Sequence, residues 1–171
     1  MQFELAFLNT LQTLRTPSLD LFFTHFTTLG NNGMIWIALA IALLLHPRYR
    51  KIGLMLAAAL IFNFIITNLT LKPIIARPRP YLFSPTIELL VPPPNDYSFP
   101  SGHTACAFAA TVSLYCAHSK LWIPSLILSI LFAFSRLYLY VHYPTDILGG
   151  ILIGSLCGMI ATKIALKFRA K

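Results

Sequence analysis

The chain has 171 residues, of which 57% are hydrophobic and only 11% are charged, whereas a soluble domain carries about 25% charged residues. So few charges could not cover a water-soluble fold of this size, so we expect the bilayer to be part of its solvent. One crossing helix takes roughly 20 residues, so at most about six or seven crossings fit, and large extramembrane domains are excluded. The net charge of +8 would suggest a nucleic-acid partner in a soluble protein, but here we attribute it to membrane topology and predict no nucleic acid.

The first 16 residues predict a helix that lies in the membrane interface. Their apolar residues recur at helical spacing beside polar ones. The stretch has no basic start and carries Glu4 and Arg15, so we do not expect a cleavable signal peptide. Thr16 and Pro17 then supply an N-cap and a first helical proline.

Six apolar segments follow and predict six crossings. They cover residues 18–29, 34–45, 52–71, 104–117, 121–134 and 147–166. We therefore predict an all-α integral membrane protein with one domain over residues 1–171. Its parts are an additional N-terminal interfacial helix (1–16), a six-helix bundle (17–166) and a basic cytoplasmic tail (167–171).

Charge orients this bundle. Eight of the 13 cations fall in segments that six crossings place on one side together with both termini, which is the cytoplasmic side by the positive-inside rule. They are Arg48, Arg50, Lys51, Lys120, Lys163, Lys167, Arg169 and Lys171. Residues 31–33, 72–99 and 139–145 then face outward, which for a multi-pass protein of a bacterial cytoplasmic (inner) membrane is the periplasm. Lys72, Arg77, Arg79 and Arg136 lie on this outward side and call for an anionic ligand.

Four features have mainly structural interpretations. The apolar, proline-rich connection 80–99 is either a lid over a site or a plain loop. Gly150, Gly154 and Gly158 favour close helix packing inside the bundle, with a homodimer seam as the alternative, and the oligomeric state is not determined. The three cysteines lie in apolar runs and are interpreted as small core residues. Trp36, Trp122 and Tyr138, Tyr140 and Tyr143 are interpreted as interfacial aromatics.

Three short segments concentrate the unusual polar residues, all at outward ends of predicted helices, so they can converge on one pocket. They are residues 72–80 (KPIIARPRP), residues 100–103 (PSGH), and Ser135-Arg136 followed by His142 and Asp146. Guanidinium groups match phosphate oxygens, and a helix that starts at Ser-Gly favours an anion. Two histidines can supply a nucleophile and an acid. A carboxylate four residues after a histidine can fix its tautomer. The set suits phosphoryl transfer without a metal.

A metal site is the alternative for the same residues. His103, His142 and Asp146 could form a two-histidine, one-carboxylate set. The neighbouring cations would oppose binding of a further cation, so we predict no metal and no cofactor.

The three segments resemble the signatures of the type 2 phosphatidic acid phosphatase (PAP2) family, which shares its site with vanadium-dependent haloperoxidases. The signatures are Lys and Arg-Pro separated by six residues, then Pro-Ser-Gly-His, then Ser-Arg, five residues, His, three residues and Asp. This chain matches them at every position between residues 72 and 146.

The resemblance implies a role for each residue. His142 would attack phosphorus and form a phosphohistidine, Asp146 would orient it, and His103 would protonate the leaving oxygen and later activate water. Arg77 lies outside the signature and is expected to contact a second phosphate or a head group. The expected ligands of the phosphoryl oxygens are Lys72, Arg79, Ser101, Gly102 and Arg136.

The resemblance further implies a hydrolase that acts on a membrane lipid phosphate. Small size and short loops favour undecaprenyl diphosphate, and phosphatidylglycerophosphate, phosphatidic acid and lipid A phosphate are the alternatives. A lipid-phosphate transporter that binds without hydrolysis is the rival from another class, and it would leave both histidines without a task. A purely structural membrane protein would avoid so many ionisable groups at one end of its helices.

Overall fold

The computed structural model describes residues 2–167, which are helical with irregular connections and contain no strand. The all-α prediction is therefore confirmed. Arg169 and Lys171 of the expected basic tail lie outside the described residues. The elements are α1 (Gln2–Gln12), α2 (Pro17–Thr28), η1 (Asn31–Gly33), α3 (Met34–Leu45), α4 (Arg50–Phe64), the π-helical η2 (Ile65–Leu71), α5 (Lys72–Ile75), η3 (Pro80–Phe83), α6 (Gly102–Cys116), α7 (Trp122–Tyr138) and α8 (Pro144–Lys167).

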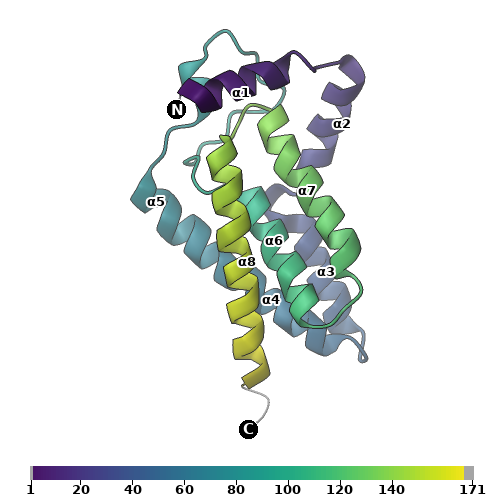
Figure 1. The fold of residues 1–171 in the computed structure, drawn as a ribbon. Coiled ribbons are helices and arrows are strands. Elements are labelled where there is room, and N and C mark those ends of the chain that lie inside the picture. Colours follow the sequence, from purple (N-terminus) through teal and green to yellow (C-terminus); the bar gives the residue numbers. More distant parts are fainter. Residues whose placement is uncertain (1, 168–171) are drawn as a thin grey trace.

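Helix α1 lies across one end of the bundle (Figure 1). Its apolar stripe divides between two environments: Leu8 and Leu11 are buried against Tyr140 and Tyr143, whereas Phe3 is 86% exposed. The apolar spacing thus predicted the helix correctly. One face of α1 packs on the protein and the other is exposed.

The predicted layout of six crossings is not confirmed by helices α2 and α3. They are bent by only 45° at η1, so they run end to end rather than side by side in opposite directions. The Ile35 amide bonds to the Leu29 carbonyl across the break (3.2 Å), and Asn32 and Gly33 adopt left-handed conformations. Each helix has 12 residues, about 18 Å, which is too short to cross roughly 30 Å of hydrocarbon alone. The two helices together are long enough for one pass.

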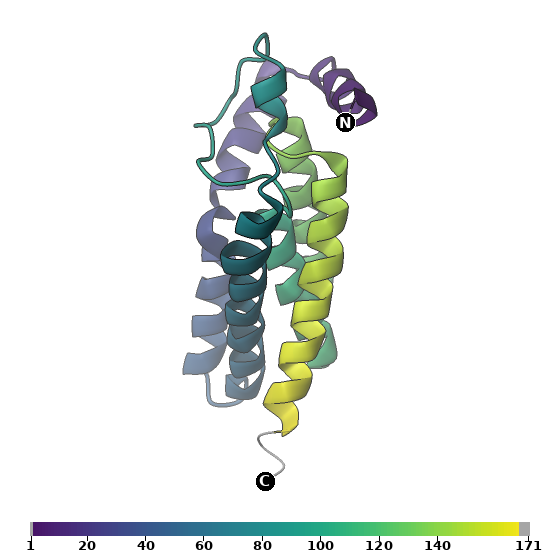
Figure 2. The ribbon, with the colours of Figure 1, turned by 90° about the vertical axis from the view of Figure 1, so that its left-hand side faces the viewer.

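This arrangement also corrects the expected placement of both termini on one side. Figure 2 shows α1 at one end of the bundle and the end of α8 at the other. Residues 31–33, expected to form an outward-facing connection, instead lie in the break between α2 and α3, where Asn31 and Asn32 are exposed and Gly33 is buried.

Within residues 2–167, two helical stretches are long and apolar enough by themselves to cross a membrane, Arg50–Phe83 and Pro144–Ala165, and the bent α2–α3 pair passes the same test when taken together. Helix α7 is a shorter apolar helix. Large apolar side chains point outward along several of them. Examples, which are 45 to 62% exposed, are Ile37 and Ile41 on α3, Ile61 on α4, Ile127 on α7 and Leu152 on α8. An exterior this apolar places the bundle in the membrane.

Helix α6 is the centre of the bundle and packs against α8, α7, α4 and α3. The glycine stripe of α8 faces it: a Cβ on Gly154 would lie 2.2 Å from the Ala105 carbonyl oxygen, and one on Gly158 would lie 2.5 Å from that of Ala109. The stripe therefore serves internal packing, as the sequence predicted. Trp36, interpreted as interfacial, is instead 2% exposed in the core beside Phe132.

Candidate active site

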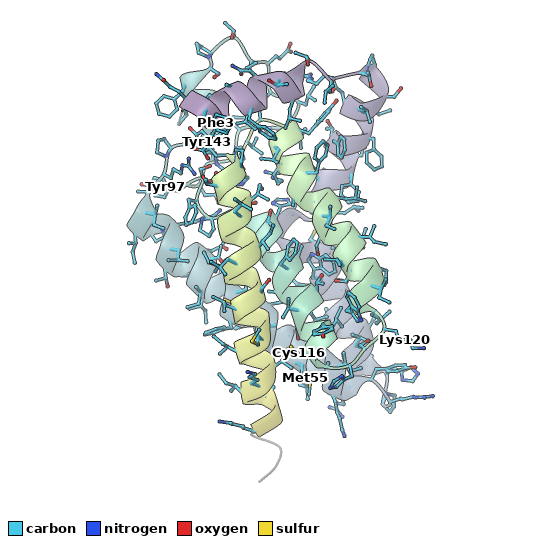
Figure 3. All side chains as sticks on the ribbon, viewed as in Figure 1. Phe3, Met55, Tyr97, Cys116, Lys120 and Tyr143 are labelled. Carbon is cyan, nitrogen blue, oxygen red and sulfur yellow. The ribbon has the colours of Figure 1, made fainter. Side chains whose placement is uncertain are left out.

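The three signature segments meet at the end of the bundle covered by α1. In Figure 3, Tyr143 and Tyr97 lie at this end, and Lys120 lies at the opposite end. A cavity of about 1010 Å³ opens here. Its polar part is lined by Asn31, Lys72, Arg79, Asp96, Gly102, His103, Arg136 and His142.

His142 lies in the short connection between α7 and α8 and is 1% exposed. Its Nδ1 is 3.3 Å from Oδ2 of Asp146, which sits one helical turn later in the first turn of α8. The Tyr143 amide (2.9 Å) and the Ser98 hydroxyl also donate to this carboxylate oxygen. Because a carboxylate only accepts hydrogen bonds, the contact assigns the ring proton to Nδ1.

The other ring nitrogen of His142 faces the cations. Nη1 of Arg79 lies 3.2 Å from Nε2 of His142 and also donates to the Val141 carbonyl (2.7 Å). A guanidinium only donates, so Nε2 carries a lone pair. Burial and the charges of Arg79, Arg136 and Lys72 hold the pKa of His142 well below its usual range. The imidazole is therefore neutral at neutral pH, as a nucleophile requires.

Three buried cations surround this nitrogen. Lys72, Arg79 and Arg136 are 5%, 3% and 4% exposed. Arg136 donates from Nη1 to the Thr27 hydroxyl (2.7 Å), whereas its buried Nε has no hydrogen-bond partner among the described residues. Buried like charges are costly without a counter-ion, so this cluster is built to hold an anion.

Asp96 supplies that anion in the structure, and sequence reasoning missed it. Its Oδ1 accepts from Nη2 of Arg79 at 2.5 Å, and its Oδ2 accepts from Nζ of Lys72. Burial raises the pKa of Asp96, but Lys72 and Arg79 outweigh it and hold the value at about 2. The available signal was that one of only five acids lies a few residues before the Pro-Ser-Gly-His segment.

Ser101 and Gly102 at the start of α6 occupy different positions relative to the cavity. Gly102 lines the cavity, and a Cβ there would lie 3.6 Å from Nζ of Lys72. Ser101, expected to hold a phosphoryl oxygen, does not line it. Its hydroxyl accepts from the amide (3.4 Å) and hydroxyl (3.0 Å) of Thr104, because it is the N-cap of α6. The Ser101 hydroxyl thus caps α6 in the structure, and its contact with a phosphoryl oxygen stays a prediction.

His103 follows in the first turn of α6 and lines the same cavity as His142. Its Nε2 lies 3.1 Å from Oδ1 of Asn31, a residue that sequence reasoning placed outside the bundle. The η1 break thus orients the second histidine. Its fit is close, since a Cβ on Gly30 would lie 2.8 Å from the His103 ring.

Arg77 takes a position different from the expected head-group contact. Its Nη1 donates to Asp146 (2.5 Å) and to the Thr145 hydroxyl (2.7 Å), and its Nη2 donates to Glu4 (2.8 Å). The guanidinium lies over the Tyr143 ring, 4.0 Å from its centroid. Arg77 does not line the cavity, because Asp146 and Glu4 hold it behind the histidine.

The alternative of a metal site finds no matching geometry. Within residues 2–167, no group of three His, Cys, Asp or Glu side chains is placed to share a metal ion. In particular, Nε2 of His103 faces Asn31.

The lower part of the cavity is apolar. It continues between α3 and α4, where it is lined by Ile37, Ile41, Leu44, Ala57, Leu60, Ile61 and Phe64. On the other side, residues 91–96 of the long connection form a wall. This connection packs on the helix ends through Leu89, Leu90 and Val91.

The fold and site define a membrane-embedded helical protein with a buried anion site and two histidines. Residues 48–170 match the family model of the PAP2 superfamily, and the chain belongs to this family. It is 34% identical over 131 residues to an undecaprenyl-diphosphatase from Sulfolobus acidocaldarius, a match that covers 76% of this chain and 63% of that protein. The chain thus spans less than two thirds of that relative's length. It is also 31% identical over 172 residues to a lipid A 4'-phosphatase from Bacteroides thetaiotaomicron, with 92% of this chain and 75% of the relative covered.

A solved structure agrees. The crystal structure of Aquifex aeolicus LpxE superposes with a TM-score of 0.80 at 32% identity, covering 94% of this chain and 95% of that one. The family resemblance inferred from the signature residues is therefore confirmed.

Proposed function

We propose that this protein is a membrane lipid phosphatase that releases phosphate from a lipid phosphate or diphosphate through a phosphohistidine on His142. One observation carries the proposal. Nδ1 of His142 lies 3.3 Å from Asp146, while the Nε2 lone pair faces a cavity that also contains His103 and three buried cations. Such a nitrogen is oriented and neutral, as covalent catalysis requires.

The reaction would proceed in two displacements. Nε2 of His142 attacks phosphorus, the bond from phosphorus to the lipid-side oxygen breaks, and His103 gives a proton to that oxygen. His103 then takes a proton from water, the resulting hydroxide attacks phosphorus, and the N–P bond breaks. The transferred phosphorus atom leaves as part of inorganic phosphate, and both histidines return to their initial protonation state.

Positive charge would stabilise both transition states. Lys72, Arg79 and the unpartnered Nε–H of Arg136 can donate to the non-bridging oxygens, and the start of α6 at Gly102 adds backbone N–H groups. In this arrangement the three side chains neutralise the phosphoryl oxygens without a metal. The Asp96 carboxylate would leave the cations when phosphate enters.

The apolar part of the cavity supports a lipid as substrate. Ile37 and Ile41 of α3 and Ile61 of α4 line it while being 45%, 51% and 62% exposed. The cavity therefore opens towards the membrane between these helices. A hydrocarbon chain could lie there while its phosphate reaches His142 from the side.

Undecaprenyl diphosphate is our proposed substrate. The similarity of the chain to the undecaprenyl-diphosphatase of Sulfolobus acidocaldarius supports it. The similarity to a lipid A 4'-phosphatase keeps lipid A phosphate, phosphatidylglycerophosphate and phosphatidic acid as the competing substrates.

We further propose a topology of five passes within one domain. The passes are α2 with α3, α4 with η2, α6, α7 and α8. The α3–α4 connection with the start of α4, the α6–α7 connection and the last turns of α8 then lie at or towards the end opposite the site. These segments carry Arg48, Arg50, Lys51, Lys120 and Lys163. The positive-inside rule makes that end cytoplasmic, so the site and α1 would face the periplasm of an inner membrane.

Phosphate release by purified protein tests the function. The four candidate lipid phosphates are assayed in detergent with wild type and with His142→Ala. The proposal expects release from at least one lipid by the wild type only. Binding of a lipid phosphate without release would instead support the transporter.

A further inference from the structure

Helix α1 is joined to the segment that carries His142 by several specific contacts. The Gln12 amide donates to the Tyr138 carbonyl (3.1 Å), and the Tyr140 hydroxyl donates to Oδ1 of Asn9 (2.8 Å). Leu8, which is 0% exposed, packs with Tyr140. These bonds hold α1 across residues 138–145, although α1 lies outside the 48–170 segment that matches the family model.

Glu4 connects this helix to the catalytic carboxylate through Arg77. Oε2 of Glu4 accepts from Nη2 of Arg77 at 2.8 Å, and Nη1 of Arg77 donates to Oδ1 of Asp146 at 2.5 Å. The other oxygen of Asp146 lies 3.3 Å from Nδ1 of His142. A continuous row of four charged or polar groups thus runs from α1 to the nucleophile.

The second carboxylate oxygen of Glu4 is hydrogen-bonded to the start of α8. Its Oε1 accepts from the Thr145 hydroxyl (2.5 Å) and amide (3.3 Å), next to Asp146. Burial alone would raise the pKa of Glu4, but bonds from Thr145 and the charge of Arg77 hold it below its ordinary value. The carboxylate is therefore ionised at neutral pH.

The geometry explains why this charge matters at His142. Arg77 is shared between two carboxylates and is fixed over the Tyr143 ring. Without the Glu4 charge, the guanidinium would turn fully to Asp146, and the carboxylate would follow it. Oδ2 would then move away from Nδ1 of His142, and small displacements at a reacting group cost rate steeply.

We propose that Glu4 is a positioning residue for His142, acting through Arg77 and Asp146, and that α1 is thereby part of the catalytic centre. The inference rests on the proposed role of His142 as nucleophile. It extends the site to an element that the signature residues do not include.

Glu4→Gln is the test, because the amide keeps the size of the side chain and an acceptor for Thr145 but loses the charge. We expect kcat on the hydrolysed lipid phosphate to fall about 10-fold with KM unchanged. Glu88→Gln is the matched control, because it removes the same charge from an exposed residue outside the relay, and it should match wild type.

A double-mutant cycle separates positioning from a general structural role. Arg77→Lys keeps the charge but loses the two-pronged geometry, and it should also lower kcat. If Glu4 acts through Arg77, adding Glu4→Gln to Arg77→Lys should cost less than twofold more. A full 10-fold further loss, or a Glu4→Gln protein that behaves as Glu88→Gln does, would overturn the inference.

A readout independent of turnover is the imidazole ¹⁵N spectrum of histidine-labelled protein in detergent, with His142 assigned from its loss in His142→Ala. Wild type should show Nδ1–H with a bare Nε2, and Glu4→Gln should mix the two tautomers. Unchanged His142 shifts in Glu4→Gln would contradict the relay. Absence of phosphate release by wild type would instead refute the proposed function. The spectra would still show whether Glu4 sets the tautomer of His142.

Discussion

Nη1 of Arg79 lies 3.2 Å from Nε2 of His142, so a residue of the first signature segment directly contacts the nitrogen expected to attack phosphorus. The same guanidinium is held from behind by the Val141 carbonyl at 2.7 Å. When phosphate enters, Arg79 can exchange its bond with the ring for bonds to a phosphoryl oxygen. Arg79 would thereby hold the phosphoryl oxygen next to Nε2 of His142.

Replacing His142 by Ala should abolish turnover, since no other imidazole in the cavity has a carboxylate partner. We expect a loss of at least about 10⁴-fold in kcat. A lipid bearing ³²P at the transferred phosphate should label wild type with an acid-labile, base-stable phosphoryl group and leave His142→Ala unlabelled. Comparable thermal unfolding of both proteins is the control, and near wild-type rates in the variant would refute the mechanism.

The pH dependence follows from the lowered pKa of His142. The free base attacks and exists above the pKa, so lowering the pKa extends activity to lower pH. The acid limb of kcat/KM should therefore lie below pH 6.5, the ordinary histidine value. Because substrate phosphate itself titrates near pH 6, an NMR titration of the His142 ring is measured in parallel. An imidazole that protonates at or above pH 6.5 would contradict the structure.

Asp96→Asn should strengthen the binding of inorganic phosphate. The Asp96 carboxylate occupies two of the cations that an incoming phosphate needs, and the neutral amide competes less. We expect the inhibition constant of phosphate to fall about 10-fold, equivalent to about 1.4 kcal/mol. Glu88→Gln serves as the control for loss of a loop carboxylate.

The same variant should be less stable without ligand. Lys72 and Arg79 are buried and would lose their counter-ion, so the melting temperature of Asp96→Asn should fall. Added phosphate should recover most of the loss, because it binds only the folded protein. A variant with unchanged phosphate affinity would show that Asp96 does not compete for the anion site.

Activity should persist in excess chelator, because arginine and lysine take the place of a metal around the phosphoryl oxygens. Vanadate, which can adopt the five-coordinate geometry of the transition state, should inhibit competitively. The assay is phosphate release after dialysis against chelator. Loss of activity that one divalent ion restores would favour the metal-dependent alternative.

The five-pass topology predicts which loops a membrane-impermeant thiol reagent reaches. Single cysteines replace the exposed Thr86, in the connection over the site, and the exposed His46, between α3 and α4. The background lacks Cys106, Cys116 and Cys157. In intact spheroplasts position 86 should react, and position 46 should react only after lysis. The reverse pattern would place the site on the cytoplasmic face.

Local sequence determined much of this protein because its signals act over short distances. Apolar runs set the helices, Thr16 and Pro17 set the start of α2, and the spacing of His142 and Asp146 placed both groups within one helical turn. The glycine stripe of α8 also showed its packing role in advance. These relations depend on helical periodicity and on residue type, which a single sequence displays directly.

Tertiary structure decided what depends on direction and on long-range partners. A 45° bend rather than a reversal at η1 aligned α2 and α3 end to end and brought Asn31 to His103. The bonds from Arg77 to Glu4 and Asp146 join residues more than 60 positions apart, so no local pattern could reveal these two ion pairs. The ion pairs of Asp96 with Lys72 and Arg79 likewise depend on the tertiary fold, because these residues are far apart in the sequence. A buried cation pairs with the carboxylate that the folded chain places next to it. Here only the packing of the long connection determines which carboxylate that is.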